Sequence, residues 1–293
     1  MNILTLVTDA QRHPLDHHVV ESISAFTGAT QCVWLAQQRA CDFVDVLPAE
    51  TWLPQLSPLI AHLPIDWCIQ DAEDRKKKLL VSDMDSTMIG QECIDEIADM
   101  IGIKEQVAAI TERAMQGELD FAASLRSRVA LLRGVPIDRL EDLWHERITP
   151  NLGAKELIAT MHHHGATSML VSGGFTFFTQ KVSDLLGFTH HHANVLLHHD
   201  GVLTGEVTEP ILDHLTKRRL LLEAQERLNL PTSQVLAVGD GANDAAMIEV
   251  AGLGVAYYAK PFLQQRANAC IKHTDLRTLL YWQGYDDDTI TSY

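Results

Sequence analysis

The sequence predicts an α/β protein in which a Rossmann-like parallel sheet carries a helical cap inserted after its first core strand, behind a smaller α+β module. Short apolar runs that end in carboxylates, hydroxyls or glycines alternate with helical segments in the second half of the chain, as in parallel sheets with right-handed crossovers. Helical periodicity dominates residues 89–149. At 293 residues, the chain is long for one domain. We therefore expect an N-terminal module at residues 1–71, a core at 72–88 and 150–293, and the cap at 89–149.

The N-terminal module is expected to be ferredoxin-like. Its elements follow the order β-α-β-β-α-β, with strands at 3–8, 31–36, 41–46 and 65–69 and helices at 17–26 and 52–62. In topology this order resembles an ACT-type regulatory module. ACT modules that bind amino acids often have a glycine in the first strand–helix loop. The loop at residues 9–16 has none, so we do not expect ligand binding of that kind.

A charged connector and then the cap follow the module. The connector, residues 71–78, ends in three lysines and predicts a solvated segment. The cap helices should each have one apolar face. Two such faces consist of Ile94, Ile97, Ala98 and Ile101, and of Phe121, Leu125, Val129 and Leu132.

The core strands are expected at residues 79–83, 168–172, 191–194, 235–240 and 254–257. In an open sheet of this kind the functional site lies at the carboxyl ends of the strands. Asp200-Gly201, between two apolar runs, also predicts a two-residue β-hairpin.

The first core strand ends in the segment Asp83-Met-Asp-Ser-Thr87, which places two carboxylates two residues apart. One of them can attack phosphorus, and Asp85 can then protonate the leaving oxygen. The alternative is a strand that simply ends in an aspartate-rich turn.

A second strand, residues 235–240, also ends in carboxylates. Asp240 lies at its end, and Asp244 follows at i+4 on the same face of the next helix. Gly241 between them permits a tight turn. Mg²⁺ prefers oxygen ligands of this kind, although Asp244 could also serve as a structural cap.

A third strand ends in Ser172-Gly173-Gly174, where exposed backbone N–H groups beside a small hydroxyl form a cradle for an anion. A serine at this position could also be a helix N-cap. Lys217 supplies a cation that can reach a phosphate. Arg218 and Arg219 follow it, so the residue that faces the site remains open at this point.

These four segments, in this order, resemble the four motifs of the haloacid dehalogenase (HAD) superfamily of phosphatases. More narrowly, they resemble the bacterial phosphoserine phosphatase family. The matching segments are residues 83–97, Met115, residues 124–129, 171–175 and 239–244, and the resemblance extends over about residues 75 to 280. It implies a HAD-like sheet in which the first core strand is central, with the second and fourth on either side.

The resemblance also implies the chemical role of each motif. Asp83 would be the nucleophile that forms an aspartyl-phosphate, and Asp85 the general acid and then base. Mg²⁺ would be bound by the side chains of Asp83 and Asp240 and by the backbone carbonyl of Asp85, and Asp244 would orient a metal-bound water. The phosphate ligands would be Ser172, the Gly173 backbone and Lys217, and Asn243 would help to fix substrate and water.

The cap would select the substrate, which the resemblance implies is O-phospho-L-serine, hydrolysed to L-serine and phosphate in the last step of phosphorylated serine biosynthesis. Glu92 would pair with its ammonium group and Arg128 with its carboxylate. Met115 and Phe121 would line the pocket. The residues alone leave Glu92 open as a solvent-facing charge and Arg128 as a surface salt bridge.

Two other functions compete with this hypothesis. The first is a HAD-family phosphatase or phosphotransferase that acts on another small phosphate ester. The second is a regulator that binds a small molecule through the N-terminal module and carries a vestigial phosphatase. The intact set Asp83, Asp85, Lys217 and Asp240 argues against the second.

The resemblance implies a small phosphorylated amino acid as the partner, and composition argues against two other classes. The net charge of −16 argues against nucleic-acid binding, which needs a basic face. No apolar run approaches the roughly 20 residues that span a bilayer, so no membrane partner is expected. Five cysteines without a C-x-x-C pair predict reduced thiols in a cytoplasmic protein. The sequence leaves the oligomeric state open, with a homodimer as one option.

Overall fold

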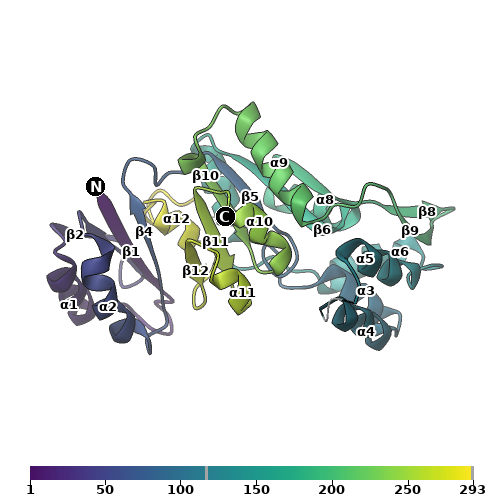
Figure 1. The fold of residues 1–293 in the computed structure, drawn as a ribbon, viewed down its shortest axis with the longest axis horizontal. Helices are drawn as coiled ribbons and strands as arrows, with labels where there is room; N and C mark the ends of the chain where they lie inside the picture. Colours follow the sequence, from purple (N-terminus) through teal and green to yellow (C-terminus); the bar gives the residue numbers. More distant parts are fainter. Residues whose placement is uncertain (116–117, 292–293) are drawn as a thin grey trace.

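The protein is elongated, with three bodies arranged along its long axis (Figure 1). This computed structural model describes residues 1–115 and 118–291, apart from the side chain of Met115. The N-terminal module lies at one end, the helical cap at the other, and the parallel-sheet core between them (Figure 1). Within the described residues, no helix is both long and apolar enough to cross a bilayer.

The N-terminal module has the predicted element order. It consists of β1 (Asn2–Thr8), α1 (His17–Thr27), β2 (Gln31–Ala36), β3 (Ala40–Val44), α2 (Ala49–Ile60) and β4 (Ile65–Asp71). The four strands form an antiparallel sheet in the order β2-β3-β1-β4. Leu4, Phe43 and Trp52 are completely buried in the core between this sheet and the helices. A relationship to ACT modules stays a prediction.

The core is a six-stranded parallel sheet in the order β12-β11-β10-β5-β6-β7. Its strands are β5 (Leu79–Ser82), β6 (Thr167–Phe175), β7 (His190–Asn194), β10 (Val235–Gly239), β11 (Leu253–Tyr257) and β12 (Ala269–Ile271). The first core strand is central, between the second and the fourth, as predicted. The edge strand β12 was not predicted, because three residues are too few to show a period.

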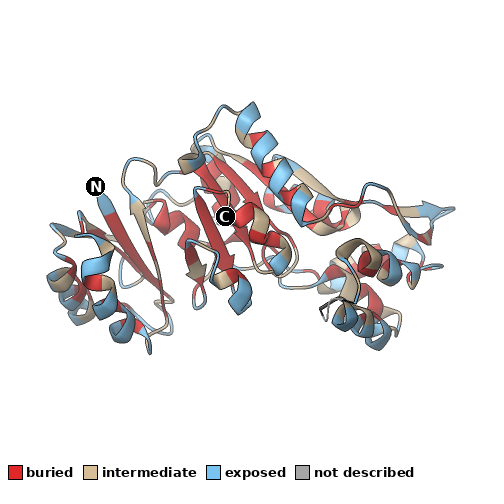
Figure 2. Cartoon of the chain, in the orientation of Figure 1, coloured by how far each residue is buried: buried red, intermediate tan, exposed pale blue. Residues whose placement is uncertain are grey.

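Helices cover both faces of this sheet. They are α7 (Ala154–His163), α8 (Thr176–Leu186), α9 (His214–Arg227), α10 (Ala245–Ile248), α11 (Pro261–Gln264) and α12 (Thr278–Trp282). Successive residues of β5 point to opposite faces: Leu79 belongs to the buried cluster that includes Leu221 of α9, and Leu80 to the one that includes Phe178 of α8. Because both faces are covered, the central strands are buried along their length (Figure 2).

The insert after β5 is helical, as predicted, and comprises α3 (Cys93–Met100), α4 (Lys104–Met115), α5 (Phe121–Ala130) and α6 (Ile137–Arg147). Its two connections to the core are paired with each other. Ile89 bridges Pro150, and the N–H groups of Gly90 and Asn151 donate to the carbonyls of Thr149 (3.1 Å) and Met88 (2.9 Å).

A β-hairpin extends from the core to the cap (Figure 1). Strands β8 (Leu196–His199) and β9 (Val202–Val207) are joined by the predicted turn, in which Asp200 and Gly201 have φ of 49° and 76°. The hairpin packs against the cap: the N–H of Gly134 donates to the carbonyl of Leu203 at 2.9 Å. The predicted boundaries assigned residues 150–293 to the core, whereas these contacts join the hairpin to the cap, because the pairing is not local in sequence.

The prediction of a solvated connector was wrong in part: Asp71, Glu73 and Lys76 are exposed, whereas Lys77 is not. Lys77 is 4% exposed, and its ammonium donates to the carbonyls of Asp74 (2.7 Å) and Ser233 (2.8 Å). Lys78 donates to the carbonyl of His164 at 3.0 Å. Backbone carbonyls satisfy these cations, and a run of lysines in a sequence does not reveal partners of that kind.

Charged groups also join the N-terminal module to the core. Arg75 donates to both carboxylate oxygens of Asp42, at 2.6 and 3.0 Å, with side-chain exposures of 11% and 5%. The buried carboxylate of Asp66 accepts three backbone N–H groups of residues 272–274. A cavity of about 660 Å³ lies beside this interface and extends to Ser86 and Gly90.

We expect Arg75→Ala to lower the free energy of unfolding of the whole chain by about 3–5 kcal/mol, because it leaves the buried Asp42 carboxylate without its cation. Urea unfolding measures the loss. Arg126→Ala is the matched control, since Arg126 pairs with Glu209 at 2.6 Å but with side chains 53% and 57% exposed. That control should lose at most about 1 kcal/mol. Equally small losses of unfolding free energy in the two variants would contradict the structural importance of the Arg75–Asp42 pair.

Candidate active site

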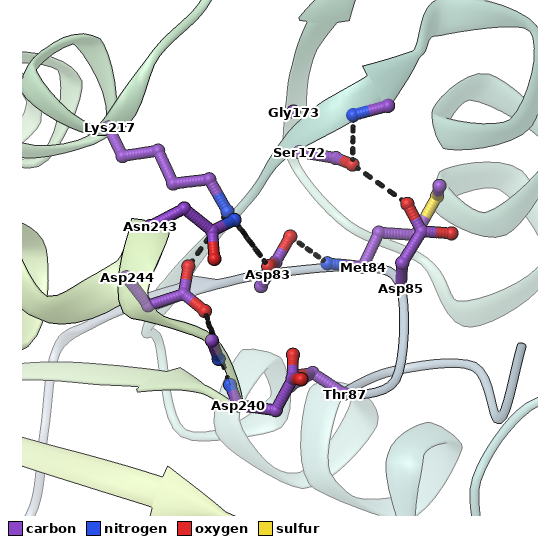
Figure 3. A network of polar contacts seen from close by, with 12 residues as sticks. Asp83, Met84, Asp85, Thr87, Ser172, Gly173, Lys217, Asp240, Asn243 and Asp244 are labelled. Atoms are coloured by element: carbon purple, nitrogen blue, oxygen red, sulfur yellow. Dashed lines mark hydrogen bonds and ion pairs between the residues drawn. The ribbon is translucent and has the colours of Figure 1, made fainter. Parts of the chain in front are cut away.

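The predicted motifs meet where β5, β6 and β10 end (Figure 3). Asp83 and Asp85 follow β5, Ser172 and Gly173 belong to β6, and Asp240 follows β10. Because the three strands are adjacent and parallel, their carboxyl ends fall side by side. The sheet order therefore brings together residues that are far apart in the sequence.

A buried ammonium group forms the centre of the site. Lys217 is 1% exposed and lies 2.8 Å from a carboxylate oxygen of Asp83 and 2.8 Å from one of Asp244. Burial alone would lower the pKa of Lys217, but the two carboxylates outweigh it and raise the pKa. Arg219 instead pairs with Glu223 on the exposed face of α9. This resolves the open choice among the three cations in favour of Lys217.

Asp83, Asp240 and Asp244 place carboxylate oxygens within 4.8 Å of one another, the one such acidic, histidine or cysteine cluster among the described residues. One lysine faces these three carboxylates. Burial and the two neighbouring carboxylates raise the pKa of Asp240 to about 8. The cluster has more negative charge than its protein partners neutralise, as expected of a cation site.

The second oxygen of Asp244 accepts the backbone N–H groups of Asp240 (3.2 Å) and Gly241 (3.1 Å). A Cβ atom on Gly239 would collide with this carboxylate, so the strand must end in glycine. Both oxygens of Asp244 thus have donors within the protein. The Asp240 carboxylate has fewer hydrogen-bond donors around it than the Asp244 carboxylate. It accepts a hydrogen bond from the Thr87 hydroxyl at 3.3 Å.

The Asp85 carboxylate lies on the other side of Asp83, facing the cap. Its oxygens accept the backbone N–H of Cys93 (3.0 Å) and the hydroxyl of Ser172 (3.3 Å). Burial and the nearby Glu92 carboxylate raise the pKa of Asp85 to about 7. A carboxyl group with such a pKa can release and take up a proton near neutral pH.

Ser172 and Gly173 lie where β6 passes the Asp85 carboxylate (Figure 3). The Ser172 hydroxyl oxygen accepts the N–H of Gly174 at 2.9 Å. The N-cap residue of α8 is Phe175, so the structure does not support an N-cap role for Ser172. Asn243 completes the group, with its amide nitrogen 3.5 Å from a carboxylate oxygen of Asp83.

The cap residues face the same region from the opposite side. The Glu92 carboxylate accepts the hydroxyl of Ser86 at 2.6 Å. The Phe121 ring lies against the backbone of Gly173, where an added Cβ atom would be 3.1 Å from Cζ. Met115 is the last residue of α4, and its side chain lies outside the part of the chain that the structure describes.

Arg128 differs from its neighbour Arg126. Its side chain is half-buried, and its Nε donates to the carbonyl of Ser124 at 3.4 Å. Among the described residues no carboxylate lies within ion-pair distance of it, whereas Arg126 pairs with Glu209. The surface salt bridge that was the alternative for Arg128 is therefore absent.

Two residues that support the site were not identified from the sequence. Ser86 orients Glu92, as described above. Asn151 donates to the carbonyls of Thr87 (2.8 Å) and Ile89 (3.2 Å), and so holds the segment that follows the nucleophile. Ser86 lies within the aspartate motif, which could have drawn attention to it. Asn151 had no comparable signal.

Comparison with known proteins places the chain in a family. Residues 80–249 match the model of haloacid dehalogenase-like hydrolases. A phosphoserine phosphatase of Polaromonas sp. (strain JS666) is 46% identical over 208 residues, 69% of this chain and 88% of that protein.

Two solved structures share nearly the whole fold. A HAD family hydrolase from Salmonella enterica serovar Typhi has a TM-score of 0.85 at 29% identity, covering 96% of this chain and 98% of its own. A probable phosphoserine phosphatase from Vibrio cholerae, in unliganded form, has a TM-score of 0.80 at 31% identity, covering 98% of this chain and 88% of its own. The fold, the motifs and these similarities together establish that the chain belongs to the haloacid dehalogenase-like hydrolases.

Proposed function

We propose that the protein is a phosphoserine phosphatase that hydrolyses O-phospho-L-serine to L-serine and phosphate. One observation carries the proposal: Asp83, held by a buried lysine, lies two residues from Asp85, whose pKa is raised to about 7. The site therefore places a nucleophile, Asp83, beside a group that can donate a proton, Asp85. The relatives named phosphoserine phosphatases support the choice of substrate.

In the proposed reaction, a carboxylate oxygen of Asp83 forms a bond to phosphorus while the bond from phosphorus to the serine oxygen breaks. Asp85 donates its proton to that oxygen, which leaves as the hydroxyl of serine. Asp85 then takes a proton from water, whose oxygen attacks the aspartyl-phosphate. Phosphate departs and the Asp83 carboxylate is regenerated.

The excess negative charge of the cluster supports a divalent cation, which we propose is Mg²⁺. Asp83, Asp240 and the backbone carbonyl of Asp85 would hold it, and Asp244 would orient its water, since both Asp244 oxygens already accept hydrogen bonds. Such a cation offsets negative charge on the phosphoryl group.

The phosphoryl oxygens would be bound by Ser172, the Gly173 backbone, Lys217 and Asn243. Donors aimed at these oxygens stabilise the charge that spreads over them in the transition state. The Ser172 hydroxyl donates to Asp85 in this structure, so it would turn to the phosphate when substrate binds.

The cap would recognise the serine part of the substrate. Glu92 would bind the ammonium group, and Arg128, which has no carboxylate partner within the described residues, would bind the carboxylate. Met115 and Phe121 would exclude water. We keep the three-unit division at residues 71 and 149 as a proposal, with the β8–β9 hairpin added to the cap.

The five cysteines, none in a disulfide, support a cytoplasmic location. A phosphate-release assay over phosphorylated amino acids and sugars, with and without Mg²⁺, tests the proposed function. Preference for phosphoserine is the expected result. Faster phosphate release from a sugar phosphate or from another ester would identify a different HAD-family substrate.

Asp83→Asn should lower kcat by at least about four orders of magnitude, because no other group can form the covalent intermediate. Phosphate release from phosphoserine at saturating substrate measures the loss. Asp184→Asn, on the exposed side of α8 and outside the proposed chemistry, is a control for general effects of removing a carboxylate. Turnover by Asp83→Asn close to that of the wild type would overturn the mechanism.

Arg128→Ala should cost roughly 2–5 kcal/mol in kcat/KM for phosphoserine, and much less for p-nitrophenyl phosphate, which has no carboxylate. Arg126→Ala removes a cation two residues away that already pairs with Glu209, and should change neither substrate much. Equal losses on both substrates for Arg128→Ala would show that this residue does not select the serine part.

Mg²⁺ should raise the melting temperature of the metal-free protein, because it relieves repulsion among Asp83, Asp240 and Asp244. At a concentration 100 times its Kd, a ligand of the folded state adds about 2.7 kcal/mol of stability. Asp240→Asn should reduce the shift, and calorimetry with and without MgCl₂ measures it. The proposed metal site is wrong if MgCl₂ leaves the wild-type melting temperature unchanged.

A further inference from the structure

Asn194, the last residue of β7, is a buried amide that no step of the proposed reaction uses. It is 3% exposed. Its Nδ2 donates to the carbonyl of Gly173 at 2.9 Å, and its Oδ1 accepts the N–H of Leu212 at 2.7 Å. Because one partner only accepts and the other only donates, the amide has a single satisfactory orientation.

The Gly173 carbonyl needs this donor because β6 bulges at that point. Val171 pairs with His192 and Phe175 with Asn194, so residues 172–174 of β6 lie opposite residue 193 alone. A bulge of this kind releases backbone groups from the ladder. The Gly174 N–H donates to the Ser172 hydroxyl at 2.9 Å, the Gly173 backbone is the part proposed to bind phosphate, and a released carbonyl must find another donor. Asn194 is that donor.

The other end of the amide holds the segment that leads into α9. Leu212 precedes Asp213, whose carboxylate caps the helix by accepting the N–H of Thr216 at 2.8 Å. Lys217 follows directly and reaches Asp83. One side chain therefore connects the glycine cradle with the start of the helix that carries the buried ammonium.

We propose that Asn194 is a positioning residue for phosphate binding, which sets the placement of the Gly173 cradle relative to Lys217 without contacting the substrate. This inference rests on the proposed roles of Gly173 and Lys217 as phosphate ligands. It adds to the proposed function a distinction between residues that recognise the serine part and residues that position the phosphate-binding groups. Arg128 acts on the serine part alone, whereas Asn194 acts on the phosphoryl group of any ester that the site accepts.

The first test is Asn194→Ala in the full chain. Its kcat/KM should fall by the same factor for phosphoserine and for p-nitrophenyl phosphate, on the order of 10²-fold, as expected when a reacting group is misplaced by about 1 Å. The inhibition constant of inorganic phosphate should rise as well. A purely structural role would lower the melting temperature without moving this constant.

Gln283 offers a matched control. It is completely buried, accepts the N–H of Lys77 at 3.0 Å and donates to the carbonyl of Leu279 at 2.9 Å. Its amide thus joins two backbone groups as Asn194 does, but outside the motifs of the site. Gln283→Ala should lower the melting temperature and leave kcat/KM and the inhibition constant of phosphate unchanged.

Asn194→Asp provides a second, independent variant. A protonated carboxyl group keeps one donor and one acceptor, so it can replace the amide, whereas the ionised form would repel the Gly173 carbonyl. Relative to the wild type at each pH, Asn194→Asp should therefore be more active than Asn194→Ala at the acid end of the activity range. This comparison also decides the question if the alanine variant fails to fold.

Three results would overturn the inference: unchanged kinetics in Asn194→Ala, equal kinetic losses in Gln283→Ala, or an Asn194→Asp variant no better than alanine at acid pH. None of them affects the proposed function, which depends on the wild-type substrate panel. Conversely, a wild-type protein that ignores phosphoserine but hydrolyses the aryl phosphate would refute the proposed substrate. The Asn194 comparison would still be decided on the aryl ester.

Discussion

The burial of the Lys217 ammonium is the constraint on which the site depends. Removing an ammonium from water costs several kcal/mol unless carboxylates and hydrogen bonds replace its hydration. Asp83 and Asp244 provide that replacement, one from the end of β5 and one from the segment after β10. The two strands and α9 must therefore converge at one point. The neighbouring position of β5 and β10 in the sheet makes this possible without strain.

The same ammonium contacts two of the four aspartate carboxylates of the site. Asp83 and Asp244 face it directly. Asp240 does not, and burial with its acidic neighbours raises the pKa of Asp240 to about 8. Asp85 points toward the cap, where burial and Glu92 raise its pKa to about 7. Burial thus brings the pKa of Asp85 close to neutral pH, where a carboxyl group can both donate and take up a proton.

The sequence predicted five of the six core strands and the ends at which functional residues lie, because these depend on local patterns of apolar and polar residues. The residues alone could not select Lys217 over Arg218 and Arg219, since the choice depends on the rotation of α9 against the sheet, and only the family resemblance pointed to Lys217. The sequence misjudged Lys77, whose ammonium donates to backbone carbonyls, one of them the distant Ser233. Asn194 was not identified either, because its hydrogen bond to Gly173 depends on a register shift between β6 and β7 that a residue pattern does not reveal.

The chain passes between core and cap at two separate places: the paired segments around Ile89 and Pro150, and the two strands of the β8–β9 hairpin. With its chain connections at these two places, the cap would rotate most easily about the line through both. Asn151 lies beside the first attachment and Asn194 at the base of the second. Groups on this axis stay nearly stationary during such a rotation. The phosphoryl end of a substrate would then rest in a fixed frame, while the opening that admits its amino-acid end changes in width.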